Sequence, residues 1–416
     1  MRDPRSRNDA LRTTLAPSLV VAVATSLFTA CGSSDSPHVT SGDAGSSSGL
    51  DASFGDSGAA SNSASGSSGS GLDAGGAPMP GALDAGAGGS GAEHDAGSAS
   101  GSGGGSGSSG GDSGGSGADA GASCGFDPVT PNATPQTRKV LCYLHAIYGN
   151  HILSGQEEDN NDNGMNTVFR ATGKYPAIRA FDVNNSQAPS QCVAQWNSGG
   201  LCMFGYHMGI NGASYSASTN IGNVLTAGTS ENASFNQDLD RIAQYVQPVR
   251  SAGGVAILRL FHEAGSGCAW FWWSKGSSAQ WQDLFRYAFK YLTVTKGLDN
   301  VLWVAPLCGN PDAAHNPGPQ YIDIGGADTY VAAGDYQPLT SIFQKTEAAF
   351  PNMMVALHEC GSIPDPTQLQ STATKWLFFN VWANPYFNAP FNPASHLQAV
   401  YSNPYVITRD MLPSFK

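Results

Sequence analysis

The feature that most constrains the fold is a repeated alternation, after residue 124, of short apolar runs with longer stretches of helical periodicity. In the stretches 236–249 and 278–296, apolar residues recur every three or four positions, as on one face of a helix. The apolar runs predict eight strands, at Ile152–Ser154, Ala177–Val183, Leu201–His207, Val255–Glu263, Asn300–Pro306, Ile322–Asp328, Met354–Glu359 and Phe378–Trp382. Eight such alternations predict an α/β fold, the (β/α)₈ TIM barrel. A doubly wound open sheet is the alternative, although no glycine-rich nucleotide loop follows the first strand.

The predicted strands end in side chains that can do chemistry. In chain order, the strand ends carry Asp182, His207, His262 with Glu263, Asp328, Glu359 and Trp382. In a barrel the carboxyl ends of all strands meet at one face, where the active sites of this fold lie. The pattern therefore predicts a single site at that face.

Two of these strand ends, those of the fourth and seventh strands, read His-Glu and bring Glu263 and Glu359 to the mouth of the barrel. A pair of carboxyl groups is what glycosidic cleavage requires, since one donates a proton and the other attacks the anomeric carbon. A lone strand-end glutamate is more often part of a salt bridge. The pair favours the catalytic interpretation.

An aromatic run, Trp270-Phe271-Trp272-Trp273, follows Glu263 closely. Such rings either fill the top of the core or stack on the apolar faces of sugar rings. Beside a carboxylate we favour stacking for at least one ring of the run, and for Trp382 as well.

These segments resemble glycoside hydrolase family 26, which consists largely of endo-β-1,4-mannanases. The resemblance rests on Arg259-Leu-Phe-His-Glu263 with the aromatic run, and on Gly297-Leu-Asp-Asn-Val-Leu-Trp-Val304. Further similar segments include Ser154-Gly155-Gln156, Lys174-Tyr-Pro-Ala-Ile178 and Asp323-Ile-Gly-Gly-Ala-Asp328-Thr-Tyr330. The similarity extends over nearly all of residues 137–390.

The resemblance implies a role for each matching residue. Glu263 corresponds to the acid/base and Glu359 to the nucleophile. The residues implied to contact the sugar or the nucleophile are His207, His262, Trp270, Asp328, Tyr330 and Trp382. Among these, Tyr330 corresponds to a tyrosine that hydrogen bonds the nucleophile, and a phenol there would stabilise the charged carboxylate.

Three positions depart from the family pattern. The stretch Ala264–Ala269 is about two residues longer than usual and contains Cys268, and His358 stands where a threonine is more familiar. Ala383 follows Trp382 where mannanases often carry an arginine. This last change concerns the substrate, so a β-1,3-xylan or a mixed-linkage β-glucan stays an alternative to mannan.

The first 123 residues differ from the rest. Residues 1–31 carry four arginines, then an apolar run from Leu15 to Ala30, the layout of a secretory signal. Small residues before Cys31 resemble a bacterial lipoprotein cleavage box, so Cys31 is the predicted lipidation site; an ordinary signal peptide is the alternative. Residues 32–123 consist almost wholly of Gly, Ser, Ala and Asp, and this composition predicts a disordered linker. Residues 124–416 form the predicted catalytic domain.

The charge and cysteine content of this domain indicate which ligands and which cellular compartment suit it. The linker holds ten acidic and no basic residues, which leaves 16 basic and 20 acidic residues in 124–416. A domain so mildly acidic lacks the basic face that nucleic-acid binding requires. Export permits disulfides, and the candidate pairs are Cys192 with Cys202, Cys124 with Cys142, and Cys268 with Cys308, which leaves Cys360 unpaired.

The sequence therefore predicts a secreted or cell-surface glycoside hydrolase, lipid-anchored in the cell envelope. It is expected to cleave internal β-1,4-mannosidic bonds of mannan, galactomannan or glucomannan by double displacement, as a monomer and without a metal or organic cofactor. A membrane is expected as a partner only through the lipid anchor. A non-catalytic glycan-binding lipoprotein is the alternative from another functional class, although the presence of both glutamates disfavours it.

Overall fold

A computed structural model describes residues 124–158 and 163–416. The predicted signal segment, Cys31 and the linker lie outside the described residues. The domain organisation predicted for the first 123 residues therefore stays a prediction.

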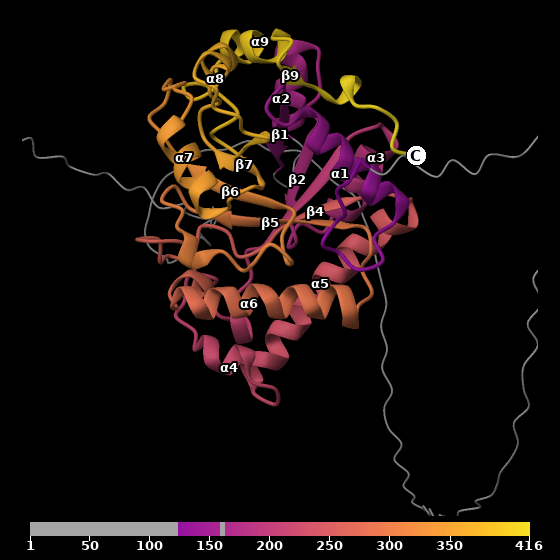
Figure 1. Cartoon of the computed structure of the whole chain (residues 1–416), viewed down its shortest axis with the longest axis vertical. Coiled ribbons are helices and arrows are strands. Elements are labelled where there is room, and N and C mark those ends of the chain that lie inside the picture. Colours follow the sequence, from indigo (N-terminus) through magenta and orange to yellow (C-terminus); the bar gives the residue numbers. More distant parts are fainter. Residues whose placement is uncertain (1–123, 159–162) are drawn as a thin grey trace, which may run out of the picture. The chain divides into compact units, whose positions relative to one another are not determined.

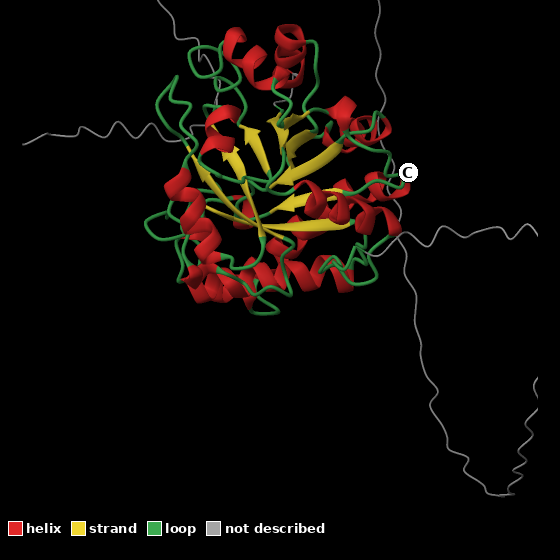
Figure 2. Cartoon of the chain, turned by 45° about the horizontal axis from the view of Figure 1, so that its top comes forward, coloured by secondary structure: helices red, strands yellow, loops and turns green. Residues whose placement is uncertain are grey.

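The described part forms a closed barrel of eight parallel strands (Figures 1 and 2). The strands are β1 (Ile152–Glu157), β2 (Ile178–Asp182), β3 (Leu201–Gly205), β4 (Ala256–Arg259), β5 (Val301–Leu307), β6 (Ile324–Thr329), β7 (Met354–Cys360) and β8 (Phe378–Val381). Each strand pairs with the next along the chain, and β1 pairs with both β2 and β8, which closes the ring. A short additional strand, β9 (Val406–Ile407), pairs with β1. Closure confirms the barrel and excludes the open sheet.

Helices surround the barrel, as Figure 2 shows in red around the yellow strands. They are α1 (Pro135–Ile147), α2 (Asn163–Thr172), α3 (Ala188–Asn197), α4 (Ile221–Leu225), α5 (Ser230–Ser251), α6 (Ser278–Lys290), α7 (Thr340–Ala349), α8 (Pro366–Ser371) and α9 (Ala394–Ser402). The predicted helical stretch 236–249 lies inside α5. The stretch 278–296 comprises α6 and a π-helical turn, Tyr291–Thr295. Ser277 caps α6 by accepting the Gln280 N–H, and the Gln280 side chain reciprocates, which explains why the helix begins there.

Alternate residues of each strand belong to two different hydrophobic clusters. Met203 and Ile257 point into the barrel, whereas their neighbours Phe204 and Leu258 pack outward against the helices. Helix α1 adds Leu141 and other apolar residues to the inner cluster. Apolar side chains therefore fill the lower barrel interior.

The inward layer nearest the carboxyl ends is polar instead of apolar. Two residues beyond Ile257 the same alternation places Arg259 inside, fully buried. Glycines on neighbouring strands provide the space: a Cβ on Gly205 would lie 3.1 Å from the Arg259 guanidinium, and one on Gly326 would lie 2.8 Å from His358. The barrel thus accommodates charged side chains directly beneath the site.

Three disulfides form: Cys124–Cys142, Cys192–Cys202 and Cys268–Cys308. They are the three candidate pairs of the sequence analysis, and Cys360 is a buried free thiol. Cys268–Cys308 joins the loop that follows β4 to the end of β5. It therefore fixes a loop that begins at one of the candidate catalytic residues.

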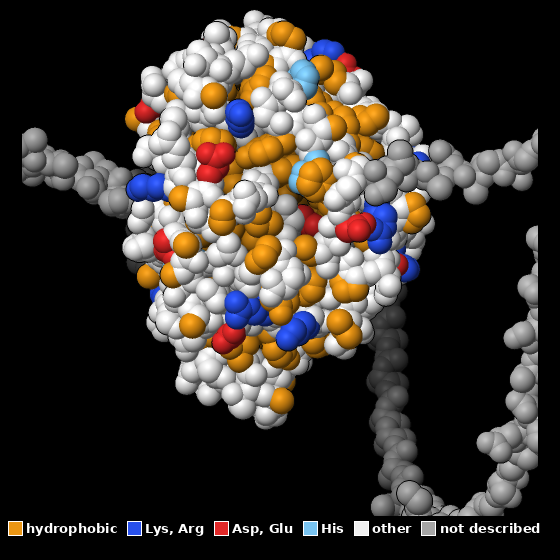
Figure 3. All heavy atoms as spheres, viewed as in Figure 1, with side chains coloured by type: hydrophobic (Ala, Val, Ile, Leu, Met, Phe, Trp, Pro, Cys, Tyr) orange, Lys and Arg blue, Asp and Glu red, His pale blue; other side chains and the backbone are white. Residues whose placement is uncertain are grey.

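The surface of the described domain carries charges of both signs. On the face drawn in Figure 3, blue and red side chains are scattered among apolar and neutral ones rather than gathered in a basic patch. Among residues 124–158 and 163–416, no helix combines the length and the apolar character needed to cross a bilayer.

Candidate active site

The structure brings the predicted site residues together at the carboxyl ends of the strands. His207 follows β3, His262 and Glu263 follow β4, Asp328 lies in β6 and Glu359 in β7. The loops contribute the remaining three, Trp270 after β4, Tyr330 after β6 and Trp382 after β8.

Three carboxyl groups meet at the centre of this face. Glu263, Asp328 and Glu359 are buried, and each offers an oxygen within 4.8 Å of the other two. Three charges so close repel one another, so the cluster favours holding at least one proton. Oxygens at this spacing could also share a cation. However, Trp270 and Tyr330 already donate to the two glutamates, which suits an acid/base pair better.

A bulge in β7 aims Glu359 into the site. The pairing of β6 with β7 runs from Ala327 opposite Leu357 to Asp328 opposite Glu359, so one residue, His358, is passed over. An extra residue of this kind turns the following side chain to the other face of the sheet. His358 and Glu359 are consequently both buried in the barrel interior, although they are consecutive in the strand.

The backbone that carries Glu263 is strained. β4 ends at Arg259, four residues before the predicted strand end, and Phe261 and Glu263 have φ angles of 59° and 56°. Positive φ is costly for such residues and persists only where the surroundings hold it. Indole N–H groups do so here: Trp281 donates to the Phe261 carbonyl at 3.0 Å, and Trp273 to the His262 carbonyl at 2.7 Å.

Glu359 is held by two donors. Arg259 Nη1 lies 2.6 Å from its Oε2, and the Tyr330 hydroxyl donates to its Oε1. Although burial alone would lower it, the pKa of Arg259 is raised by Glu359 and Glu157, so the guanidinium stays charged. Both contacts orient the Glu359 carboxylate and place positive charge and a hydroxyl donor on its oxygens, as suits a nucleophile.

A second carboxylate faces the other side of this guanidinium. Glu157 Oε2 lies 3.8 Å from Arg259 Nη2 and accepts a 3.1 Å hydrogen bond from Asn380. Burial raises the pKa of Glu157 to about 7, and Arg259 opposes the shift. His358 completes the surroundings of the arginine, with its Nδ1 3.4 Å from Nη1 and its Nε2 donating to the Leu307 carbonyl at 2.9 Å.

The surroundings of Glu263 differ from those of Glu359, because they favour the neutral carboxylic acid. Burial and the nearby charge of Glu359 raise the pKa of Glu263 to about 7, while a hydrogen bond from the Trp270 indole opposes the shift. Burial and the same two glutamates raise the pKa of Asp328 well above its ordinary value. The site therefore pairs a carboxyl group that keeps its proton near neutral pH with one held by a cation and a phenol. This is the division of roles between a general acid and a nucleophile.

Two histidines lie beside the carboxylates in a chain of hydrogen bonds. His207 Nδ1 bonds Asp182, and its Nε2 lies 3.0 Å from His262 Nε2. Burial alone would lower the pKa of His207, but Asp182 raises it overall; burial and Arg259 lower that of His262. His207 is then the donor, so neutral His262 carries its proton on Nδ1. That buried N–H finds no acceptor among the described residues.

The aromatic residues divide into two groups. Trp270 is 44% exposed and Trp382 is partly exposed, whereas Trp272 and Trp273 are fully buried. The Trp382 ring lies 5.6 Å from His207 and 5.9 Å from the Arg259 guanidinium, at the edge of the carboxyl cluster. Trp270 and Trp382 can therefore meet a ligand, while Trp272 and Trp273 belong to the core and hold backbone carbonyls.

The sequence reasoning assigned no role to three buried residues of this site, Arg259, Glu157 and His358. Arg259 could have been found, since an arginine inside an otherwise apolar strand needs a buried partner. Glu157 was missed because the first strand was predicted to end at Ser154, three residues too early.

Comparison with known proteins supports the similarity noted in the sequence. The profile of glycosyl hydrolase family 26 matches residues 129–411. A mannan endo-1,4-beta-mannosidase of Thermothelomyces thermophilus is 26% identical over 313 residues, 69% of this chain and 63% of that protein. Mannan endo-1,4-beta-mannosidase A of Piromyces sp is 29% identical over 319 residues, 69% of this chain and 50% of that protein. The chain thus spans less than two thirds of these curated relatives.

A solved structure of similar fold contains a sugar ligand. It is the beta-mannanase from a symbiotic protist of the termite Reticulitermes speratus complexed with gluco-manno-oligosaccharide. It matches with a TM-score of 0.63 and 26% identity, over 69% of this chain and 98% of that chain.

Proposed function

The chain belongs to glycosyl hydrolase family 26, and from that premise we propose that it is a retaining endo-β-1,4-mannanase. One observation carries the proposal. Glu263 and Glu359 present oxygens within 4.8 Å of each other; the pKa of Glu263 is raised to about 7, while Glu359 is paired with the Arg259 guanidinium. Retaining glycosidases separate their carboxyl groups by about 5–5.5 Å, whereas inverting enzymes need about 6.5–9.5 Å to admit a water.

In the first step Glu359 attacks the anomeric carbon as the glycosidic bond breaks. Glu263 gives its proton to the departing oxygen, so the leaving chain gains a hydroxyl and a glycosyl ester forms on Glu359. Arg259 and Tyr330 orient the attacking carboxylate, and both donors are fixed before the substrate arrives. The groups that interact with the Glu359 carboxylate are therefore in position before the reaction begins.

In the second step a water molecule cleaves the ester. Esterification removes the charge of Glu359, one of the causes that raise the pKa of Glu263, so Glu263 becomes a base. It takes a proton from the water, whose oxygen attacks the anomeric carbon, and Glu359 leaves as a carboxylate. The Trp270 N–H stabilises Glu263 in its ionised form during this step.

The sugar at the cleavage point is proposed to contact His207, His262, Asp328 and Trp382. Trp382 supports the proposal, since its ring is partly exposed beside His207 and offers an apolar surface to the pyranose. The names of the relatives favour mannan as substrate, and the gluco-manno-oligosaccharide of the similar termite-symbiont structure favours glucomannan; galactomannan is included as a further mannan-type polysaccharide. A panel of mannan, β-1,3-xylan and mixed-linkage glucan, assayed by release of reducing ends, tests the assignment, and preferred cleavage of either other glycan would contradict it.

We also propose that the protein is exported and held at the cell surface by a lipid on Cys31, as a monomer. Three disulfides support an oxidising compartment. The protein should fractionate with membranes, and Cys31→Ser should release it. Retention of that variant in the membrane fraction would argue against the anchor.

A further inference from the structure

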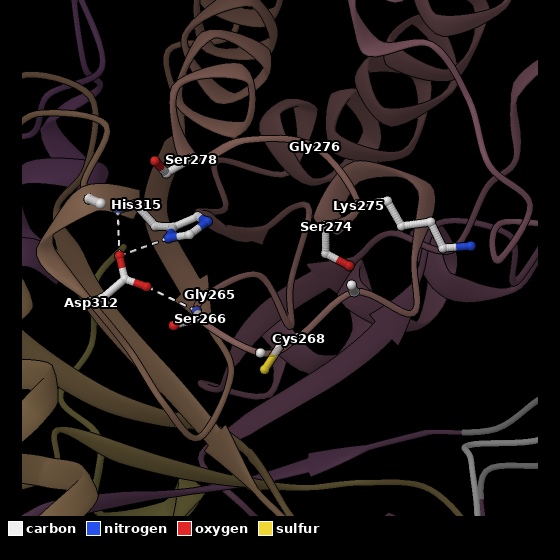
Figure 4. Close-up of a pocket in the computed structure, with 12 residues that line it drawn as sticks. Gly265, Ser266, Cys268, Ser274, Lys275, Gly276, Ser278, Asp312 and His315 are labelled. Carbon is white, nitrogen blue, oxygen red and sulfur yellow. Dashed lines mark hydrogen bonds and ion pairs between the residues drawn. The ribbon is translucent and has the colours of Figure 1, made fainter.

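A hollow of about 550 Å³ opens between the loops that follow β4 and β5 (Figure 4). One wall is the loop that follows β4, beginning at Gly265, two residues after Glu263. The opposite wall is the loop after β5, with Asp312 and His315, and the start of α6 at Ser278 closes the side between them. Its volume falls within the range of about 300–1,000 Å³ that is typical of small-molecule sites.

The walls of this hollow are rigidly connected. Asp312 joins them, since one carboxylate oxygen accepts the Ser266 N–H at 2.9 Å and the other accepts the His315 N–H at 3.1 Å. The Cys268–Cys308 disulfide and a 2.8 Å hydrogen bond from Cys308 N to the Ala264 carbonyl tie the same loops a second time. A shape held in two ways costs little ordering entropy when a ligand binds.

His315 supplies a polar group that faces the open space. Its Nδ1 donates to Asp312 Oδ1 at 2.8 Å, which fixes the ring, and the Trp281 ring lies 5.9 Å away. In Figure 4 the other ring nitrogen points toward the middle of the hollow, below Ser278. Within the described part of the chain no group hydrogen bonds this Nε2. A sugar hydroxyl, which both donates and accepts, can pair with it and with the Ser278 hydroxyl.

The position of the hollow decides which part of a substrate can reach it. Glu263 protonates the leaving oxygen, so the leaving chain departs over Glu263 and the loop after it. Trp382 follows β8, which lies across the barrel from β4 and β5, the strands whose following loops form the hollow. The hollow therefore lies on the Glu263 side of the barrel mouth, the side on which the leaving chain departs.

We propose that this hollow is an accessory sugar site that binds a hexopyranose unit of the leaving-group side of the substrate, with His315 as its fixed polar contact. The proposal rests on the proposed hydrolase function. Part of the wall is the loop that is longer here than in the family pattern, so the site belongs to this chain rather than to the shared barrel.

Two variants test it without touching the catalytic residues. His315→Ala removes the polar contact, and Ala314→Trp fills the hollow from its exposed rim. Ala313→Trp is the matched control, since Ala313 is equally exposed and adjacent but does not line the hollow. Hydrolysis of β-1,4-mannotetraose, -pentaose and -hexaose labelled at the reducing end is followed with the full chain, as kcat/KM and as the position of the cut.

Both hollow variants should lose about three- to tenfold in kcat/KM on the longest oligosaccharide, the worth of one or two hydrogen bonds. They should keep near-normal values on the shortest, and their cuts should move toward the labelled end. Ala313→Trp should behave as the wild type. A loss that is equal at every length, no loss at all, or the same loss in Ala313→Trp would overturn the accessory site. A wild-type protein that cleaves none of these oligosaccharides would instead contradict the proposed function.

Discussion

Replacing Trp270 with Phe should move the alkaline limb of the pH–activity profile to higher pH. The change keeps an aromatic ring but removes the indole N–H that donates to Glu263. That hydrogen bond stabilises the ionised carboxylate, so it lowers the pKa of Glu263 against burial and the charge of Glu359. Without it, Glu263 keeps its proton to a higher pH. Because the first step needs protonated Glu263, activity then persists to a higher pH.

The size of the shift follows from the strength of the bond. A hydrogen bond to a charged group contributes about 1.5–3 kcal/mol, and the lower end applies because Trp270 is 44% exposed. One pKa unit corresponds to about 1.4 kcal/mol, so the expected shift is about one unit. The alkaline limb of the wild type should lie near the Glu263 pKa of about 7.

The assay is the pH dependence of kcat/KM on a soluble mannan oligosaccharide, which reports the pKa values of the free enzyme. Trp382→Phe is the control, since Trp382 makes no hydrogen bond to Glu263 within the described residues; it should lower kcat/KM at every pH without moving the limb. If Trp270→Phe leaves the limb in place or moves it to lower pH, the assignment of Glu263 and its indole donor is wrong.

Four further predictions follow from the same contacts. Glu263→Ala should reduce hydrolysis of mannan about 10²–10⁴-fold, yet azide should restore turnover of an aryl mannobioside whose leaving group needs no proton; absence of rescue would speak against the acid/base role. Tyr330→Phe removes a donor to Glu359, so kcat should fall while the free energy of unfolding changes by only about 1 kcal/mol; an unchanged kcat would refute the role. Arg259→Met leaves Glu157 and Glu359 buried without their cation and should destabilise the protein by about 3–5 kcal/mol, measured by urea denaturation, with Arg250→Met at the exposed Asp299 pair as a milder control. Burial raises the pKa values of Glu157, Glu263 and Asp323 to about 7, so between pH 5 and 7 the native protein holds protons that the unfolded chain has released; the Tm should therefore fall as the pH rises through this window, and a rising Tm would contradict these assignments.

The barrel was predictable because its hydrophobic pattern repeats. Runs such as Met354–Glu359 have strand length, and the stretches between them carry helical periodicity, so the number and order of elements follow from local sequence. The convergence of strand ends then placed Glu263 near Glu359 without any knowledge of loops. The resemblance to family 26 supplied the individual roles.

The fine geometry of the site was not predictable from the same pattern. Strict alternation along β7 allows only one of His358 and Glu359 to face inward, and the bulge that turns both inward depends on pairing with β6. The strained backbone at Phe261 likewise depends on a hydrogen bond from the Trp281 indole N–H, twenty residues away, to the Phe261 carbonyl. Such features arise from contacts between distant segments, which a local pattern does not encode.

The burial of polar side chains beneath the site also depends on contacts between distant segments. The glycines of β3 and β6 leave space for Arg259 and His358, which are buried together with Glu157. A side chain's neighbours across a barrel depend on the register of every strand between them. The sequence can therefore indicate that Arg259 needs a buried partner, but not that it has two.

In the proposed mechanism Glu359 forms a covalent glycosyl intermediate while Glu263 serves as the acid/base. The most direct measurement is to treat the purified protein with a 2-deoxy-2-fluoro glycosyl fluoride of mannobiose, which forms the ester quickly and releases it slowly. Intact mass and peptide mapping then locate the label. We expect one added disaccharide per chain, bound to Glu359; a label on another residue, or active protein that forms no adduct, would show that Glu359 is not the nucleophile.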